Sequence, residues 1–338
     1  MNGKTILVTG GAGYIGSHTA LALIKNGYDV VIFDNLECGH IETVDTLKNL
    51  SSYRGRIIDF IKGDLKNPEE VSSVFIRYKI DTVVHFAAYI SVEESVKNPQ
   101  KYYENNIVGS MNLFSEMIKH DVNKIVFSST AAVYGEPKSS EALQENHEKY
   151  PINPYGWSKF MVEQILSDYS KINKIKSAVL RYFNVAGASS EAIIGEWHNP
   201  ETHLIPNILR ATNGKTFQLF GNDFDTKDGT CVRDYVNVED LADAHLLALD
   251  YLESGGISDC FNIGTNEGNT VKEIFDICER VLEQKINVKI CERREGDPAF
   301  LVACNNKAQK ILGWTPKRSI EDSILSAYKW QAKLAEKK

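Results

Sequence analysis

Residues 4–16 read KTILVTGGAGYIG, a stretch that decides the predicted fold because glycines join a strand to a helix. Residues 4–9 are apolar and β-branched, as in a buried strand, and residues 14–26 show helical apolar spacing. Gly10, Gly13 and Gly16 lie at the junction, where missing Cβ atoms permit a tight turn. They also let backbone N–H groups approach a pyrophosphate at the helix N-terminus. The context between strand and helix distinguishes this dinucleotide-binding loop from an ordinary turn.

The segments that follow repeat the same alternation of strand and helix. Further apolar strands are predicted at 30–33, 57–61, 82–86, 124–128 and 177–181, with long helices at about 99–120 and 154–171. Continuous apolar strands separated by helices favour a parallel sheet covered on both faces. The predicted fold class is therefore α/β, a Rossmann-type doubly wound parallel sheet with a smaller, interleaved C-terminal substrate-binding domain. The first domain is expected at 1–184 and the second mainly at 185–338, with segments near 238–263 returning to the first.

Composition limits the classes of function. The chain has 338 residues, 43% hydrophobic and 25% charged, and its formal net charge of −7 argues against a general nucleic-acid or anionic-membrane binder. No stretch is long and apolar enough to predict a membrane span, and the N-terminus does not resemble a signal peptide. Six scattered cysteines indicate reduced thiols in a cytoplasmic protein. Eight histidines without metal-ligand spacing predict no metal site.

An acidic residue ends each of two early strands. Asp34 follows Gly16 by 18 residues, where a carboxylate can accept hydrogen bonds from ribose hydroxyls and would repel a 2′-phosphate. Asp34 and Asn35 therefore favour NAD over NADP as cofactor. Asp64 ends the third strand, and two interpretations stay open there: a contact with the adenine edge, or a helix-capping aspartate.

A tyrosine and a lysine predict the reaction chemistry. Tyr155 and Lys159 are four residues apart, so they share one helix face and can point into one pocket. A phenol with a pKa of about 10 is a poor base at neutral pH. Lowering its pKa to neutrality requires about 4 kcal/mol of phenolate stabilisation. One nearby cation at intermediate dielectric supplies about that much. Thr130 follows a predicted strand at the sheet edge where ligands bind, and its hydroxyl suits a sugar hydroxyl.

Together, TGGAGYIG (9–16), SSTAAVYG (128–135) and YGWSK (155–159) resemble the extended short-chain dehydrogenase/reductase family. The resemblance runs nearly end to end. Segments HFAA (85–88), NNIVG (105–109), RYFNVAGA (181–188), DGTCVRDY (228–235) and RREGD (293–297) narrow it to the UDP-glucose 4-epimerases. It implies interconversion of UDP-glucose and UDP-galactose through a 4-keto intermediate with tightly bound NAD, in galactose metabolism, by a homodimer assembled through the two long helices.

The resemblance also assigns residues to roles. It implies that Tyr155 is the base, that Lys159 lowers its pKa, and that Thr130 assists. The positions implied for NAD are Gly10, Gly13, Tyr14, Ile15, Gly16, Asp34, Asn35, Asp64, Leu65, Phe86, Ala87, Ala88, Asn106, Ser128, Tyr155, Lys159 and Phe183. Those implied for the UDP-sugar are Thr130, Tyr155, Phe183, Asn184, His203, Leu204, Phe220, Arg233, Tyr235, Arg294 and Asp297. Relatives often have asparagine where this chain has His203.

Three other functions are compatible with the same fold. A nucleotide-sugar 4,6-dehydratase needs an additional acid and base, and related dehydratases carry Asp-Glu where this chain has Ala131 and Ala132. A non-catalytic NAD-sensing regulator predicts a degraded Tyr/Lys pair, and the pair is intact. A dual-specificity epimerase would also accept N-acetylated UDP-hexosamines. Leu301 would leave more room for the acetamide than an aromatic residue, and Phe300 less, and an alignment gap leaves this choice open.

Overall fold

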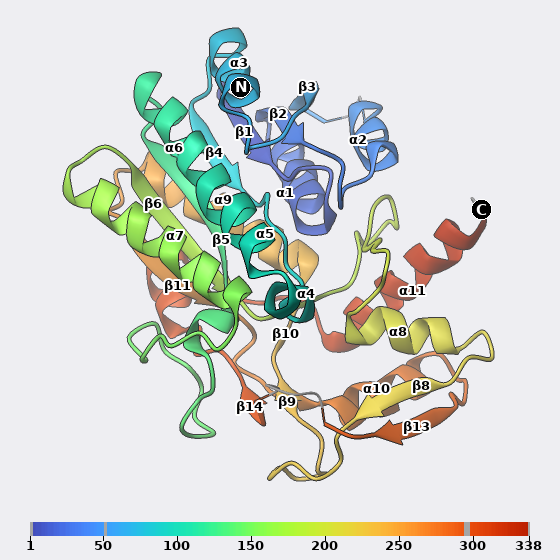
Figure 1. Ribbon diagram of the computed structural model, residues 1–338. Coiled ribbons are helices and arrows are strands. Elements are labelled where there is room, and N and C mark those ends of the chain that lie inside the picture. Colours follow the sequence, from blue (N-terminus) through green and yellow to red (C-terminus); the bar gives the residue numbers. More distant parts are fainter. Residues whose placement is uncertain (1–2, 51–52, 294–297, 337–338) are drawn as a thin grey trace.

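A seven-stranded parallel sheet forms the centre of the structure, a computed structural model that describes residues 3–50, 53–293 and 298–336 (Figure 1). Its order is β11-β6-β5-β4-β1-β2-β3. The strands are β1 (Thr5–Thr9), β2 (Asp29–Asp34), β3 (Arg56–Lys62), β4 (Thr82–His85), β5 (Lys124–Thr130), β6 (Lys176–Tyr182) and β11 (Asp259–Ile263). The predicted Rossmann-type fold is confirmed. Strand order reverses between β1 and β4, and ligands bind at such a switch point.

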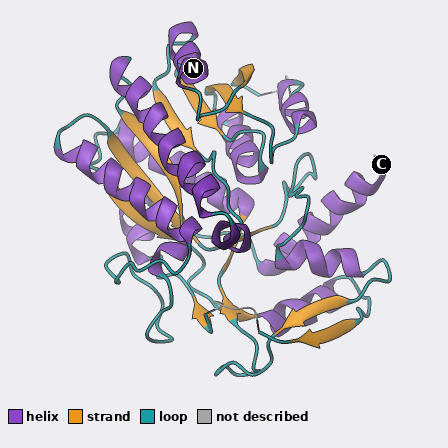
Figure 2. Ribbon diagram, viewed as in Figure 1, coloured by secondary structure: helices purple, strands orange, loops and turns teal. Residues whose placement is uncertain are grey.

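Helices cover both faces of the sheet, which explains why its strands are largely apolar (Figure 2). Helices α1 (Tyr14–Lys25) and α9 (Val238–Glu253) bury Ile24 and Leu249 in one apolar layer. On the other face, α3 (Pro68–Arg77), α6 (Gly109–Lys119) and α7 (Pro154–Lys171) bury Val74, Leu113 and Leu166. Helix α2 (Ile41–Lys48) contacts α1 and β3.

The long helix expected at about 99–120 is interrupted by a π-helical turn. Helix α5 (Pro99–Tyr103) continues through η1 (Glu104–Val108) into α6, and the short helix α4 (Val92–Lys97) precedes it. A single π-turn inside a helix commonly marks a functional site. Here the turn contains Asn106, one of the residues predicted to contact the cofactor.

After β6, short elements form a second layer below the sheet in Figure 1. Three small sheets pair β7 with β10, β9 with β12 and β14, and β8 with β13. Ile208, Phe217, Ile274 and Ile324 share an apolar core between these elements. The strands are β7 (Asn184–Ala186), β8 (Phe217–Phe220), β9 (Val232–Arg233), β10 (Tyr235–Asn237), β12 (Asn269–Thr270), β13 (Val288–Cys291) and β14 (Phe300–Leu301). The helices are α8 (Leu204–Ala211), α10 (Val271–Val281), η3 (Ala308–Leu312) and α11 (Ile320–Glu336), and η2 (Ala131–Tyr134) follows β5.

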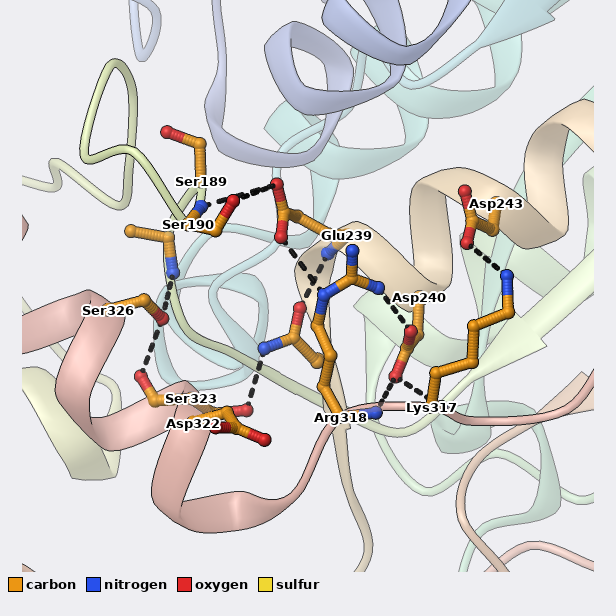
Figure 3. A network of polar contacts seen from close by, with 12 residues as sticks. Ser189, Ser190, Glu239, Asp240, Asp243, Lys317, Arg318, Asp322, Ser323 and Ser326 are labelled. Carbon is orange, nitrogen blue, oxygen red and sulfur yellow. Dashed lines mark hydrogen bonds and ion pairs between the residues drawn. The ribbon is translucent and has the colours of Figure 1, made fainter.

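A polar network fastens the start of α11 to the first turn of α9 (Figure 3). Asp240 accepts hydrogen bonds from the backbone N–H groups of Lys317 and Arg318 at 3.0 and 2.9 Å, and from the Arg318 guanidinium at 2.5 Å. Ser326 Oγ in turn accepts from the Ala188 N–H at 3.1 Å. The chain beyond β7 is therefore held against both helices. In the part of the chain that the structure describes, no helix has the length and apolar character needed to cross a bilayer.

Candidate active site

The glycine loop lies at the carboxyl end of β1, and the space around its glycines differs from one to the next. Gly10 has φ +71°, and a Cβ there would lie 2.6 Å from the backbone nitrogen of Ala87. At Gly16 a Cβ would collide with the Gly10 carbonyl. Over Gly13 a Cβ would meet only that carbonyl oxygen, at 3.4 Å, so the N-terminus of α1 is open. Tyr14 and Ile15 begin that helix, and the arrangement fits a pyrophosphate.

Asp34 ends β2 beside this loop, as the sequence predicts. Its carboxylate accepts hydrogen bonds from the N–H groups of Ala12 at 3.0 Å and Leu36 at 2.8 Å. Burial raises the pKa of Asp34, and these two hydrogen bonds oppose the rise. Each carboxylate oxygen retains a lone pair for a ribose hydroxyl.

Asp64 does not cap a helix, because the N-cap of α3 is Asn67. Its carboxylate accepts from the Lys66 N–H at 2.8 Å and from Asn35 Nδ2 at 3.4 Å. The contact with Asn35 joins the ends of β2 and β3 at the same sheet edge. Leu65 follows, buried, and its carbonyl accepts a hydrogen bond from Asn112 at 2.9 Å.

Asn106 connects the predicted cofactor segment after β4 to the predicted catalytic helix. Phe86, Ala87 and Ala88 follow β4, and the next residue is Tyr89. Asn106 Oδ1 accepts from the Tyr89 N–H at 2.9 Å, and Asn106 Nδ2 donates to the Tyr89 carbonyl at 3.1 Å and to Ser158 Oγ at 2.9 Å. The amide therefore positions the segment 86–89 against α7.

Thr130 and Tyr155 meet at the carboxyl end of β5. Asn153 caps α7 by accepting from the Gly156 N–H at 2.8 Å, so that Tyr155 lies in the first turn. The Thr130 hydroxyl hydrogen-bonds the Tyr155 phenol, and its oxygen also accepts from the Ala132 N–H at 3.1 Å. Burial raises the pKa of Tyr155, and the bond with Thr130 only partly opposes this. The protein's own groups therefore do not produce the lowered phenol pKa expected from the sequence, which needs a further positive charge.

Lys159 lies one helical turn beyond Tyr155 and is fully enclosed. Its ammonium donates to the Ser128 carbonyl at 2.8 Å and lies 5.1 Å from the centre of the Phe127 ring. Burial lowers the pKa of Lys159 to about 7, against the opposing charge of Glu163.

A buried ion pair fixes α7, the predicted catalytic helix, and the sequence pattern did not indicate it. Glu163 lies four residues after Lys159 and binds the Arg181 guanidinium through Nη2 at 2.6 Å and Nε at 3.0 Å. Ser129 donates to the same carboxylate, and Arg181 Nη1 donates to the Tyr134 hydroxyl at 3.1 Å. Two features of the sequence could have indicated this ion pair: an acidic residue on the helix that carries Tyr155 and Lys159, and an arginine inside an apolar strand.

Tyr182 is a second residue that the sequence did not suggest. It ends β6, its hydroxyl pairs with Ser128 Oγ, and burial raises its pKa. Its ring lies 6.1 Å from that of His245, which in turn is 4.7 Å from Phe86. Ring contacts through His245 of α9 thus connect the end of β6 to the segment after β4.

The predicted substrate residues come from several elements. Phe183 is buried, and the Asn184 N–H donates to the Asp234 carbonyl at 3.0 Å, which holds β7 against β10. His203 precedes α8, and its imidazole faces Glu196. Leu204 begins α8, Phe220 ends β8, Tyr235 begins β10 and Arg233 lies buried in β9. Arg294 and Asp297 lie outside the described residues.

The register of β14 distinguishes Leu301 from its neighbour. Leu301 pairs with Arg233 and packs against the apolar cluster that contains Phe183. Phe300 pairs with Val232 and lies beside Gly268. Adjacent strand residues face opposite sides of a sheet, so Leu301 lies on the side of Phe183 and Phe300 on the side of Gly268.

Comparisons with known proteins agree with this geometry. The profile of the family described as GDP-mannose 4,6 dehydratase matches residues 7–326. A UDP-glucose 4-epimerase of Rhizobium meliloti (strain 1021) is 46% identical, covering 98% of both chains. One of Rhizobium leguminosarum bv. trifolii is 48% identical, covering 98% of this chain and 99% of the relative.

Solved structures give the same result. The UDP-glucose-4-epimerase of Stenotrophomonas maltophila, with bound NAD and formylated UDP-arabinopyranose, superposes with TM-score 0.94 at 36% identity, covering 99% of this chain and 100% of that one. The UDP-Glc/GlcNAc 4-epimerase of Campylobacter jejuni superposes with TM-score 0.84 at 41% identity, covering 98% and 100%.

Proposed function

The chain belongs to the UDP-glucose 4-epimerases of the extended short-chain dehydrogenase/reductase family, and we propose that it interconverts UDP-glucose and UDP-galactose with NAD. The observation that carries the proposal is the Tyr155 phenol, hydrogen-bonded to Thr130, with Lys159 one turn away on α7. All three lie at the sheet edge that also carries the open glycine loop.

The residues present fit NAD. The open N-terminus of α1 over Gly13 suits the pyrophosphate, and the Asp34 carboxylate suits the ribose hydroxyls. When bound, NAD supplies a reversible acceptor for the hydride of the sugar C4. Its oxidised nicotinamide would also bring a positive charge to the site, which would favour the phenolate of Tyr155.

Tyr155 and Thr130 perform the proton transfer. Tyr155, as phenolate, takes the proton of the C4 hydroxyl, and Thr130 orients that hydroxyl. Loss of this proton and of the C4 hydride leaves a 4-keto sugar. The sugar turns over while UDP stays bound, and Tyr155 returns the proton when hydride reaches the opposite face. Contacts between the protein and UDP, which lies away from C4, hold the intermediate in the site while the sugar turns over.

Arg233 and the chain around Phe183 and Leu204 hold the UDP. A planar guanidinium suits phosphate oxygens, and Arg233 lies buried in β9 next to Leu301 of β14. The 4,6-dehydratase alternative has no support here, because Ala131 and Ala132 supply neither the acid nor the base. The comparisons do not favour N-acetylated sugars as the main substrate, since the curated relatives are UDP-glucose 4-epimerases.

The proposal includes a homodimer that forms through the paired helices η1/α6 and α7. Val108, Met111 and Met161 are exposed on these helices at 49, 42 and 40%. Val108 also lines a hollow of α5 and η1 that includes Tyr103 and Ile107. Exposed apolar surface of this kind marks interaction sites. We also propose a cytoplasmic location, which the six free cysteines, all of them described, support.

A coupled assay tests the function. The purified protein is offered UDP-galactose or UDP-N-acetylgalactosamine without added NAD, and formation of the 4-epimer is followed. We expect turnover of UDP-galactose without added cofactor, and slower turnover of the N-acetylated sugar. No turnover of UDP-galactose, even with NAD supplied, would refute the proposal.

A further inference from the structure

Four ligating side chains converge on the segment between β7 and α8, outside the catalytic residues. The segment contains Glu196, His198, Glu201 and His203, and each places one ligating atom within 4.8 Å of the other three. The histidine spacing predicts no metal site. The missed signal is an alternation of acid and imidazole, E-W-H-N-P-E-T-H at 196–203.

The distances in this cluster are those of a coordination shell. His198 Nδ1 lies 3.1 Å from Glu196 Oε1 and 3.7 Å from Glu201 Oε1, and His203 Nδ1 lies 3.9 Å from Glu201 Oε1. His203 Nδ1 also contacts Glu196 Oε1. Ligands about 2.0–2.2 Å from a tetrahedral Zn²⁺ are separated from one another by about 3.3–3.6 Å. The three separations of 3.1, 3.7 and 3.9 Å lie on either side of this ligand-to-ligand distance, so small side-chain shifts would complete a tetrahedron.

Burial and charge point in the same direction. The Glu196 and Glu201 side chains are only 5 and 1% exposed, and the nearest arginine nitrogen, Nη2 of Arg210, is 3.7 Å from Glu201. Two buried carboxylates bring two negative charges to the cluster, which a single divalent cation would balance. His198 Nδ1 is buried and lies between the Glu196 and Glu201 carboxylates, so one ion could contact all three side chains.

We propose that Glu196, His198, Glu201 and His203 bind one Zn²⁺ ion in a closed, four-ligand structural site. Two imidazoles and two carboxylates suit zinc, whereas calcium and magnesium prefer oxygen ligands alone. Four protein ligands leave no open position for a substrate or water, so the ion has no part in the reaction. The imidazole of His203 then belongs to the metal, and only its backbone remains near the UDP.

The site joins the glycine loop to the substrate side. The Tyr14 ring packs edge-on against His198 at 6.2 Å, and its hydroxyl donates to the Gly187 carbonyl at 2.6 Å. Trp197 stacks on His40, with ring centres 3.7 Å apart. Beyond the fourth ligand, α8 begins at Leu204. An ion here would fasten the crossing from the nucleotide-binding loop to α8.

Metal content of the purified holoprotein tests the site. Wild type, His198→Ala and a matched control, His147→Ala in a surface loop, are incubated with Zn²⁺, dialysed against metal-free buffer and analysed for zinc. We expect about one zinc per chain in wild type and control, and at least tenfold less in His198→Ala. A chelator should lower the melting temperature of the first two only. Equal zinc in all three proteins, or none in any, would overturn the proposal.

A measurement on the wild type covers the case in which His198→Ala does not fold. Anomalous scattering at the zinc edge from crystals of the zinc-incubated protein should give a peak between the four side chains. A map without a peak there would overturn the proposal. Neither measurement depends on turnover, so the zinc site and the proposed function can fail independently.

Discussion

Replacing Tyr155 with phenylalanine removes one oxygen from the proposed proton path. The aromatic ring stays in the first turn of α7, and Asn153 still caps that turn. Thr130 loses its partner, but its oxygen continues to accept from the Ala132 N–H at 3.1 Å. The free energy of unfolding should therefore change by no more than about 1 kcal/mol.

The catalytic loss should be much larger. A positioned general base contributes about 10²–10⁴-fold to the rate, or about 3–5 kcal/mol of transition-state stabilisation. The neighbouring phenol cannot replace it, because the Tyr182 hydroxyl is already paired with Ser128. Turnover in Tyr155→Phe should therefore fall at least 100-fold, whereas the dissociation constant for UDP should stay within about threefold.

Turnover is followed with UDP-galactose in the coupled assay, and UDP binding by calorimetry. Tyr150→Phe is the matched control, since Tyr150 is 66% exposed and lies five residues before the base. It should retain wild-type turnover. A Tyr155→Phe enzyme within tenfold of wild type would refute Tyr155 as the base. A parallel loss of UDP binding would indicate a binding role instead.

Three further predictions follow from the packing under the site. Glu163→Gln leaves the buried Arg181 without a counter-ion and should lower the free energy of unfolding, measured in urea, by about 3–5 kcal/mol. The control Glu148→Gln, in an exposed ion pair, should not change it measurably. Equal effects of the two substitutions would contradict this prediction. Gly16→Ala places a Cβ against the first glycine of the loop and should abolish co-purified NAD, measured spectrophotometrically; full NAD retention would count against it. Burial lowers the pKa of His245 to about 4, so the folded protein favours the neutral ring. The stability that this gives is complete above about pH 6.5, and the free energy of unfolding should fall by about 3 kcal/mol as the pH drops to 4. An equal fall in His245→Gln would exclude this cause.

The sheet was predictable because its strands carry their own signal. Strands β1 and β2 lie inside the sheet and are buried on both faces, so each contains an uninterrupted apolar run, such as Ile6–Val8 in β1. The π-turn at Glu104–Val108 was not predictable, because the apolar spacing continues through it into α6. Its reason is tertiary: Asn106 must reach both Tyr89 and Ser158.

The site was predictable where one short segment contains its chemistry. Tyr155 and Lys159 are one helical turn apart, so their spacing alone places them together. By contrast, Glu163 and Arg181 meet only because α7 packs across β6, and Ser128 meets Tyr182 only because β5 pairs with β6. Sequence spacing carries no information on contacts that depend on packing.

The substrate range depends on one register that the sequence left open. Because β14 pairs Leu301 with Arg233 and packs it near Phe183, Leu301 rather than Phe300 should limit the room beside the sugar. Leu301→Tyr should therefore raise the ratio of UDP-galactose to UDP-N-acetylgalactosamine turnover at least tenfold, whereas Phe300→Tyr should leave it unchanged. The same coupled assay measures both ratios. If only Phe300→Tyr changed the ratio, the face assigned to β14 would be wrong, and the sugar would lie on the side of Gly268.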